Sequence, residues 1–446
     1  MLGSVALVRA DRLEKRNAFC DSISGVCVCW TKRAGCGVSP FDQAHETIRE
    51  ETVLRRRTVL KGAGAMAASL ALPGHGFAQG AGVKIGLILP MTGPFASTGR
   101  QIDAAVRLYM QKNGAEVAGR KVEVVLKDDT GTADVTRRLA QELIVNDRVN
   151  VIAGFGLTPL AMAVGPLATQ AKVPAIVMAA ATSSITEASP FIVRSSFTLP
   201  QVTVPLAAWG AENGIKKVVT LVTDYGPGID AEKAFKERFT ASGGEVTAEL
   251  RVPLRNPDFA PFLQRAADAK PDAVFVFVPS GVGAQFMKQF VERGLDKSGI
   301  QLIATGDVTD DDILNEMGDV ALGTITTHHY SAAHDSTENR AFVEAFRKAN
   351  DNMRPNFMAV GGYDGMHLIY EALRKTGGGT AGEGLVNAMK GMAWQSPRGP
   401  ISIDPQTRDI IQNVYVRKVE RVDGELYNVE FATIANVKDP VKATKS

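Results

Sequence analysis

Two short stretches of the sequence bring hydroxyl side chains and backbone amide groups to the predicted ends of buried strands. In GFGLTPLAM (154–162), Thr158 follows the apolar run 149–153 and precedes Pro159 at the predicted start of a helix. In VMAAATSSIT (177–186), Thr182 follows the next predicted strand and three alanines, whose small size lets a ligand approach the backbone. The free amide groups and the dipole of a helix N-terminus attract anions. Together the two stretches predict a carboxylate-binding site.

Thr158 also has a purely structural interpretation. Its hydroxyl is expected to cap the helix, and Pro159 fits the first helical position. Capping alone would explain the first stretch. The second hydroxyl, at Thr182 one strand later, favours a ligand in addition to the cap.

Nucleotide, metal and catalytic sites lack their usual motifs. Neither PMTGPFASTG nor GFGLTPLAMAVG contains a GxGxxG or GxxxxGK[ST] phosphate loop. Three of the six histidines, His328, His329 and His334, lie in HHYSAAHD, which is one possible metal site. On a strand, however, His328 and His329 would face opposite sides, and we expect His329 to line a cleft instead. No nucleophile triad, carboxylate pair or reactive cysteine stands out, so we expect no enzyme activity, cofactor or metal.

The chain after residue 82 alternates between short apolar runs and amphipathic segments of helix length. Strands are predicted at 83–90, 121–128, 149–153 and 174–178, with helices at 99–113, 133–145 and 158–171 between them. A second series follows, with strands at 217–222, 245–252, 273–278 and 301–305 and helices at 228–242, 259–269 and 283–293. Strands that are apolar almost throughout indicate a parallel, doubly wound α/β sheet covered by helices on both faces.

The predicted organisation is two lobes between which the chain passes more than once. A crossing is expected at 191–201, with further helices at 339–350, 357–375 and 381–390 and final strands at 414–420 and 427–435. We assign 79–199 plus 332–400 to the first lobe and 200–331 plus 401–446 to the second. Ligands of such sheets bind outside the carboxyl ends of the strands, which here means the cleft between the lobes.

The N-terminal region differs from the rest of the chain. Residues 53–78 combine RRRTVLK, a short uncharged run and a small-residue ending, the pattern of an export signal; RR followed by TVLK resembles the twin-arginine type. All four cysteines lie upstream of it, where a metal site or two disulfides are conceivable. We interpret residues 1–52 instead as an over-extended, disordered start. The net charge of +2 argues against nucleic-acid binding.

Several motifs in this order resemble one family. MTGPFASTG, GFGLTP, AAATS, TDYGPG, TGDVTD, GGYDG and GPISID together are similar to periplasmic solute-binding proteins of ABC importers, in the branched-chain amino-acid (Leu/Ile/Val) family, over residues 82–436. The segment HHYSAAHDS resembles the branch that takes up aromatic acids. The resemblance implies the type I periplasmic binding protein fold, with two lobes joined by three crossings, and a monomer that delivers its ligand to a membrane permease.

The resemblance also implies roles for individual residues. The position of Thr98 contributes a wall, Thr158 holds the ligand carboxylate, and Tyr225 closes over the ligand. Asp307 matches the carboxylate that receives the ammonium of an amino acid. The grip on the ligand carboxylate is completed by Ala180, Ala181 and Thr182.

Two departures from the family pattern favour a larger ligand. Amino-acid binders often have large aromatic residues where Thr98 and Ser280 stand, and a glutamate in place of Asp307. The smaller residues leave room for an aromatic ring. That ring could be lined by Phe155, Phe197, Tyr225 and His329. An aromatic carboxylate is therefore expected; hydrophobic amino acids, short amides or urea-like solutes, and a ligand sensor on the same fold are the alternatives.

Overall fold

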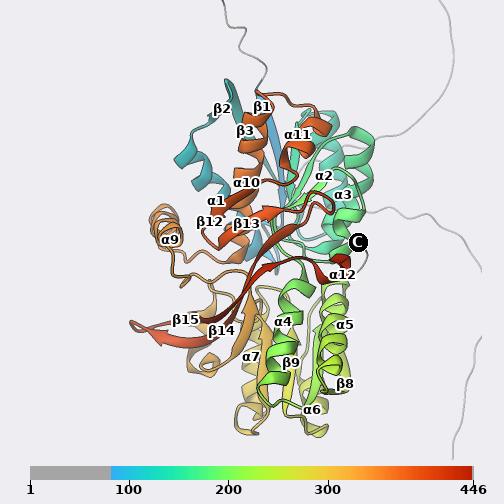
Figure 1. Cartoon of the computed structure of the whole chain (residues 1–446), viewed down its shortest axis with the longest axis vertical. Helices are drawn as coiled ribbons and strands as arrows, with labels where there is room; N and C mark the ends of the chain where they lie inside the picture. Colours follow the sequence, from blue (N-terminus) through green and yellow to red (C-terminus); the bar gives the residue numbers. More distant parts are fainter. Residues whose placement is uncertain (1–81, 444–446) are drawn as a thin grey trace, which may run out of the picture. The chain divides into compact units, whose positions relative to one another are not determined.

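The computed structural model describes residues 82–443, and these residues form two β-sheets with helices packed around them (Figure 1). The predictions for residues 1–78, the extended start and the export signal, lie outside the described residues. No helix within 82–443 is long and apolar enough to cross a membrane.

The first sheet has the strand order β2-β3-β1-β4-β5-β6 and is parallel except for the hairpin of β2 with β3. Its strands are β1 (Val83–Leu89), β2 (Glu116–Val117), β3 (Arg120–Asp128), β4 (Val151–Gly154), β5 (Ala175–Val177) and β6 (Ile192–Arg194). The register pairs Ile88 with Gly154 and Gly154 with Val177, so three strands end at the same level. The turns that follow them are thereby brought side by side.

Helices from two distant parts of the sequence pack around this sheet. They are α1 (Ala96–Asn113), α2 (Ala133–Val145), α3 (Thr158–Ala171), α9 (Thr337–Ala349), α10 (Phe357–Lys375) and α11 (Gly382–Met389). Helix α10 lies against α1, and two glycines of GGYDG make this possible. A Cβ atom on Gly361 would lie 2.2 Å from the carbonyl oxygen of Met178, and one on Gly362 would lie 3.0 Å from that of Ile102. Gly361 therefore sets how closely α10 approaches the end of β5, and Gly362 sets how closely it approaches α1.

The second sheet has the order β12-β13-β14-β11-β10-β9-β7-β8, with β15 paired to β14. Its strands are β7 (Lys217–Thr223), β8 (Glu245–Val252), β9 (Ala273–Phe277), β10 (Gln301–Thr305), β11 (Ile325–His328), β12 (Ala393–Ser396), β13 (Gly399–Ile403), β14 (Ile410–Val422) and β15 (Glu425–Val437). Strands β7 to β11 are parallel, and β12 to β15 are antiparallel. The helices that follow these strands or close the chain are α4 (Leu199–Glu212), α5 (Gly226–Ala241), α6 (Ala260–Asp268), α7 (Gly283–Glu292), α8 (Leu314–Met317) and α12 (Pro440–Ala443).

The predicted series of strands and helices from 83 to 305 is present, with small shifts at the ends. Helix α4 was not predicted, because Pro205 in its interior indicates a break. The Gln201 side chain, which accepts from the backbone amide of Thr198 at the start of the helix, and the burial of one face of the helix outweigh that proline. Strands β12 and β13 were also missed, because the segment is rich in turn residues; both pair within the second sheet. The lobe boundaries remain a prediction.

The chain passes between the two sheets at three places: from β6 to α4, from β11 to α9 and from α11 to β12. A buried arginine, Arg398, and its carboxylate partner contact two of these links. Arg398 forms an ion pair of 2.8 Å with Asp364 of α10, and its guanidinium also donates to the carbonyl oxygens of Ser195 and Ser196 in the first link. Asp364 accepts further hydrogen bonds from Trp394 and Ser396. Asp364 thus ties α10 to two of the links.

Replacing Asp364 by alanine should be strongly destabilising. The substitution leaves the fully buried Arg398 without its carboxylate partner, and breaking a buried pair in this way costs about 3–5 kcal/mol. Asp335→Ala is the matched control, because Asp335 pairs with Arg340 on the surface and its side chain is 93% exposed. Urea unfolding followed by circular dichroism measures both. A midpoint for Asp364→Ala no lower than that of Asp335→Ala would show that the buried pair is not holding the links.

Candidate functional site

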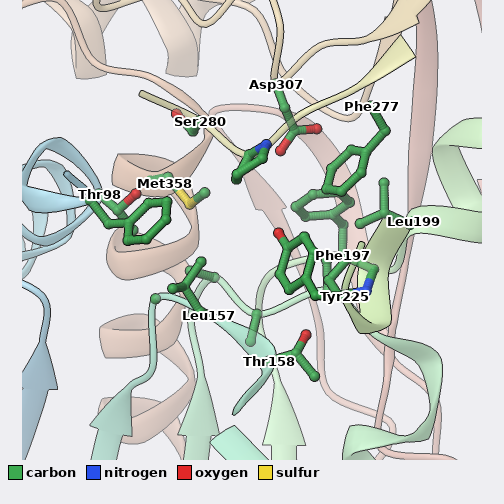
Figure 2. Close-up of a pocket in the computed structure, with 17 residues that line it drawn as sticks. Thr98, Leu157, Thr158, Phe197, Leu199, Tyr225, Phe277, Ser280, Asp307 and Met358 are labelled. Carbon is green, nitrogen blue, oxygen red and sulfur yellow. The ribbon is translucent and has the colours of Figure 1, made fainter. Parts of the chain in front are cut away.

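A cavity with about 360 Å³ of empty space lies between residues that follow strands of the two sheets (Figure 2). The first sheet and its helices contribute Phe95, Thr98, Gly156, Leu157, Thr158, Ala179, Ala180, Ala181, Phe197 and Met358. The second contributes Leu199, Tyr225, Pro227, Phe277, Pro279, Ser280 and Asp307. As expected from the fold class, the cavity lies at the carboxyl ends of the strands.

Seven of the ten predicted site residues line this cavity. They are Thr98, Thr158, Ala180, Ala181, Tyr225, Ser280 and Asp307. Thr98 lies in the first turn of α1, whereas Thr158 and the alanines follow β4 and β5. From the second sheet, Tyr225, Ser280 and Asp307 follow β7, β9 and β10. The structure therefore brings together turns that are more than two hundred residues apart in the sequence.

Thr158 does not cap its helix. It is the first residue of α3, Leu157 holds the N-cap position, and no side chain caps this end. The Thr158 hydroxyl is instead 2.8 Å from that of Thr182, with which it shares a hydrogen bond. In the first turn of α3, Pro159 has no N–H, and the amide groups of Leu160 and Ala161 donate to the carbonyl oxygen of Leu157, which leaves the backbone amide of Thr158 as the available donor. The N-terminus of α3 can therefore donate to an anion in the cavity.

Three predicted residues lie outside the cavity lining. Thr182 is behind Thr158, to which it is hydrogen-bonded, and it supports the wall without lining it. Phe155 is fully buried at a left-handed backbone position, φ 66°, which turns its ring into the core. His329 is also fully buried, and its ring packs against Phe197, which does line the cavity. All three belong to the layer behind the lining.

The two adjacent histidines do not face opposite sides as predicted. Strand β11 ends at His328, so the alternation of a strand no longer holds at His329. The two rings lie 4.4 Å apart between centroids, and both contact Phe197 and Phe357. Within residues 82–443, no group of three metal-ligating side chains is placed to hold a metal ion.

Apolar lining residues were largely missed from the sequence. Figure 2 shows Phe197, Leu199 and Phe277 on one side of the cavity and Leu157 and Met358 on the other. Phe197 was named as a ring-lining candidate, but the other four were not. Leu157 precedes Thr158 and Leu199 lies in the predicted crossing at 191–201, but neither was named as a lining residue. Phe277 and Met358 have the sequence character of ordinary core residues. The apolar walls are suited to a flat or hydrophobic ligand body.

The acidic end of the cavity is Asp307, which is 3% exposed. Its Oδ2 atom has no hydrogen-bond partner among residues 82–443, and neither has the hydroxyl of Ser280. Burial, and secondarily the Asp307 carboxylate, raises the pKa of the nearby Tyr225 well above its usual value, so Tyr225 keeps its proton and can donate. In Figure 2, Thr158 and Asp307 lie on opposite sides of Tyr225. The cavity thus has a donor-rich end, apolar walls and an acceptor at the far end.

Comparison with known proteins identifies similar chains. A family model described as periplasmic binding protein matches residues 82–425. A Leu/Ile/Val-binding protein homolog of Brucella melitensis is 49% identical over 363 residues, covering 80% of this chain and 93% of the relative. Among solved structures, a solute-binding protein of an ABC transporter from Rhodopseudomonas palustris BisB5, in complex with 3,4-dihydroxybenzoic acid, is 67% identical with a TM-score of 0.80, covering 81% and 99% of the two chains. Another from R. palustris, with 4-hydroxybenzoate, is 44% identical with a TM-score of 0.79 and the same coverage.

Proposed function

The chain belongs to the periplasmic binding protein family, and we propose that it captures a hydroxylated aromatic carboxylate for an ABC importer. The single observation that carries this proposal is the polarity of the cavity: amide and hydroxyl donors at Thr158, and the carboxylate of Asp307 at the other end. A ligand that matches has a carboxylate at one end, a ring in the middle and a hydrogen-bond donor at the other end.

The donor end suits a carboxylate for two reasons. The backbone amide of Thr158 and the dipole of α3 both favour a negative charge. Ala179, Ala180 and Ala181 have small side chains and are at most 5% exposed, so a ligand can approach the backbone of this turn. In this arrangement the Thr158 hydroxyl donates to the carboxylate, and the Thr182 hydroxyl donates to the Thr158 oxygen in the hydrogen bond that they share.

The acceptor end distinguishes among carboxylates. A ring hydroxyl supplies the donor that the Asp307 carboxylate lacks, and leaving a buried charged group unpaired is costly. The two R. palustris proteins described above, at 67% and 44% identity, were solved with benzoates that carry ring hydroxyls. These relatives support the same ligand class for this chain.

The expected binding free energy is consistent with a ligand that has both a ring and two polar ends. Burying a ring of about 200 Å² at ~25 cal/mol/Å² contributes about 5 kcal/mol, and each charge-assisted hydrogen bond adds roughly 1.5–3 kcal/mol. Micromolar binding needs about 8 kcal/mol after the costs of association. Neither the ring nor the polar ends suffice alone, so both features of the cavity are required.

A hydrophobic amino acid is the second candidate. Asp307 could receive its ammonium group, and the Brucella relative is named for leucine, isoleucine and valine. The carboxylate end would be the same for both ligand classes. The two ligand classes differ at the other end, where Asp307 accepts from an ammonium group or from a ring hydroxyl. They also differ in whether the apolar walls contact an aromatic ring.

The proposal extends to the cellular role. We propose that residues 53–78 direct export to the periplasm, and that the two sheets, each with its helices, act as two lobes that close on the ligand. The monomer then delivers the ligand to the membrane permease, without chemistry and without nucleic acid. A sensor on the same fold would use the same cavity.

A ligand panel tests the function directly. Binding raises the melting temperature as ligand concentration exceeds Kd, so 4-hydroxybenzoate and 3,4-dihydroxybenzoate should stabilise the purified protein. Leucine, urea and a neutral sugar should do so far less. Stabilisation by leucine and not by the benzoates would select the amino-acid candidate, and stabilisation only by the sugar would refute a carboxylate ligand.

Removing both hydroxyls should weaken carboxylate binding. Thr158→Ala together with Thr182→Ala is expected to raise the Kd for 4-hydroxybenzoate at least ~tenfold, because a donor to the carboxylate and the group that orients it are lost. Thr169→Ala is the control: this threonine lies on the same helix α3 but bonds to Gly165 and Ser189, away from the cavity. Isothermal titration calorimetry gives each Kd. An unchanged Kd in the double variant would mean that the hydroxyls only stabilise the turn.

A further inference from the structure

A buried histidine behind the cavity and a buried carboxylate that lines it face each other without a hydrogen bond. His328 ends strand β11 and is 0% exposed, and both of its ring nitrogens lack a partner among residues 82–443. Its Nε2 atom lies 3.6 Å from Oδ2 of Asp307, which lacks a partner as well. That distance exceeds the usual range for an N–H···O bond. Buried polar groups are rarely left in this state, because each orphaned group carries its full cost of desolvation.

The ring of His328 is held in place by packing. Its centroid is 4.2 Å from that of Phe357 and 4.8 Å from that of Phe197. On the opposite side, Gly306 has no Cβ, and a Cβ there would lie 2.8 Å from the Cβ of His328 and 1.9 Å from Nη2 of Arg417. The histidine therefore has little freedom, whereas Asp307 follows Gly306 in the turn after β10 and faces the cavity.

The chemistry of the two groups is complementary. Burial lowers the pKa of His328 to about 4, so the imidazole is neutral at neutral pH and carries one N–H donor. A proton on Nε2 points that donor at Oδ2. The nearby guanidinium of Arg417 adds a positive charge on the same side. The other carboxylate oxygen of Asp307 then remains for the cavity.

We propose that His328 is a positioning residue for ligand selection: when a ligand fills the cavity, Nε2–H of His328 donates to Oδ2 of Asp307 and holds the other oxygen toward a ring hydroxyl. The inference rests on the proposed function, since it requires a ligand with a ring hydroxyl opposite its carboxylate. A shift of a few tenths of an ångström brings the two atoms into hydrogen-bond distance. The arrangement makes hydroxyl recognition depend on a residue that does not line the cavity.

If His328 positions Asp307, it affects how well the protein discriminates 4-hydroxybenzoate from benzoate. An oriented carboxylate accepts from the hydroxyl of 4-hydroxybenzoate, and benzoate offers it no donor. The ratio of the Kd for benzoate to the Kd for 4-hydroxybenzoate therefore measures the alignment of Asp307. A hydrogen bond to a charged group corresponds to a ratio of roughly tenfold to hundredfold. Loss of packing alone would raise both Kd values together and leave the ratio unchanged.

Calorimetry with these two acids on four proteins tests the proposal. His328→Phe keeps a flat ring but removes the donor, and its Kd ratio should fall at least ~fivefold below that of the wild type. His328→Gln can return an N–H near the position of Nε2 and should restore the ratio to within about twofold. His329→Gln is the matched control, because His329 is equally buried beside His328 but forms no ion pair with a carboxylate among residues 82–443, and it should change both Kd values by the same factor.

Four outcomes would overturn the proposal or its premise. If His328→Phe keeps the wild-type ratio, or if His328→Gln fails to restore it while folding normally, His328 does not position Asp307. If the wild type binds both acids with the same Kd, or binds neither, the proposed ligand class fails first, independently of His328. Should His328→Phe not fold, His328→Met removes the donor with a flexible side chain and replaces it in the comparison.

Discussion

The buried guanidinium of Arg194 holds the carboxylate-binding turn in the position on which the rest of the site depends. It donates to the carbonyl oxygens of Ala180, Thr182 and Phe197 at 2.6–2.9 Å and to the carboxylate of Asp409 at 2.8 Å. Arginine presents several donors in a rigid planar arrangement, and here they join the turn after β5, the first link and the segment before β14. Burying such a charge is costly unless it is fully paired, and Arg194 is fully buried and paired on both sides.

This constraint extends to the second sheet. Asp409 also forms an ion pair of 2.5 Å with Lys442 of α12, and Lys442 donates to Thr186. Asp230 of α5 accepts from the backbone amide of Ser183, and Gly226 lies so close that a Cβ would be 2.7 Å from the Thr182 hydroxyl. Residues from both sheets therefore hold the donor end of the cavity in place. Tyr225 is the N-cap residue of α5, so the start of the same helix positions it. The geometry of the site follows from how the sheets are linked as much as from the residues that line it.

The order of strands and helices could be predicted from the sequence, because continuous apolar runs alternate with amphipathic segments. The position of the cavity followed from the same pattern, since parallel strands place their following turns at one edge. What could not be predicted were interactions between distant residues. Thr158 shares its hydrogen bond with Thr182 rather than capping α3, and Phe155 turns inward because of a left-handed backbone angle. The linking roles of Arg194 and Arg398 could not be predicted from the sequence, because some of their hydrogen-bond partners lie about two hundred residues away.

The central claim is that the cavity is polar at both ends and orients one ring between them. A crystal structure of the protein with 4-hydroxybenzoate measures this most directly. We expect the ligand carboxylate within ~3 Å of the Thr158 amide or hydroxyl and the ring hydroxyl within ~3 Å of the Asp307 carboxylate. A ligand in the reverse orientation, with its carboxylate nearest to Asp307, or one bound outside this cavity, would contradict the account.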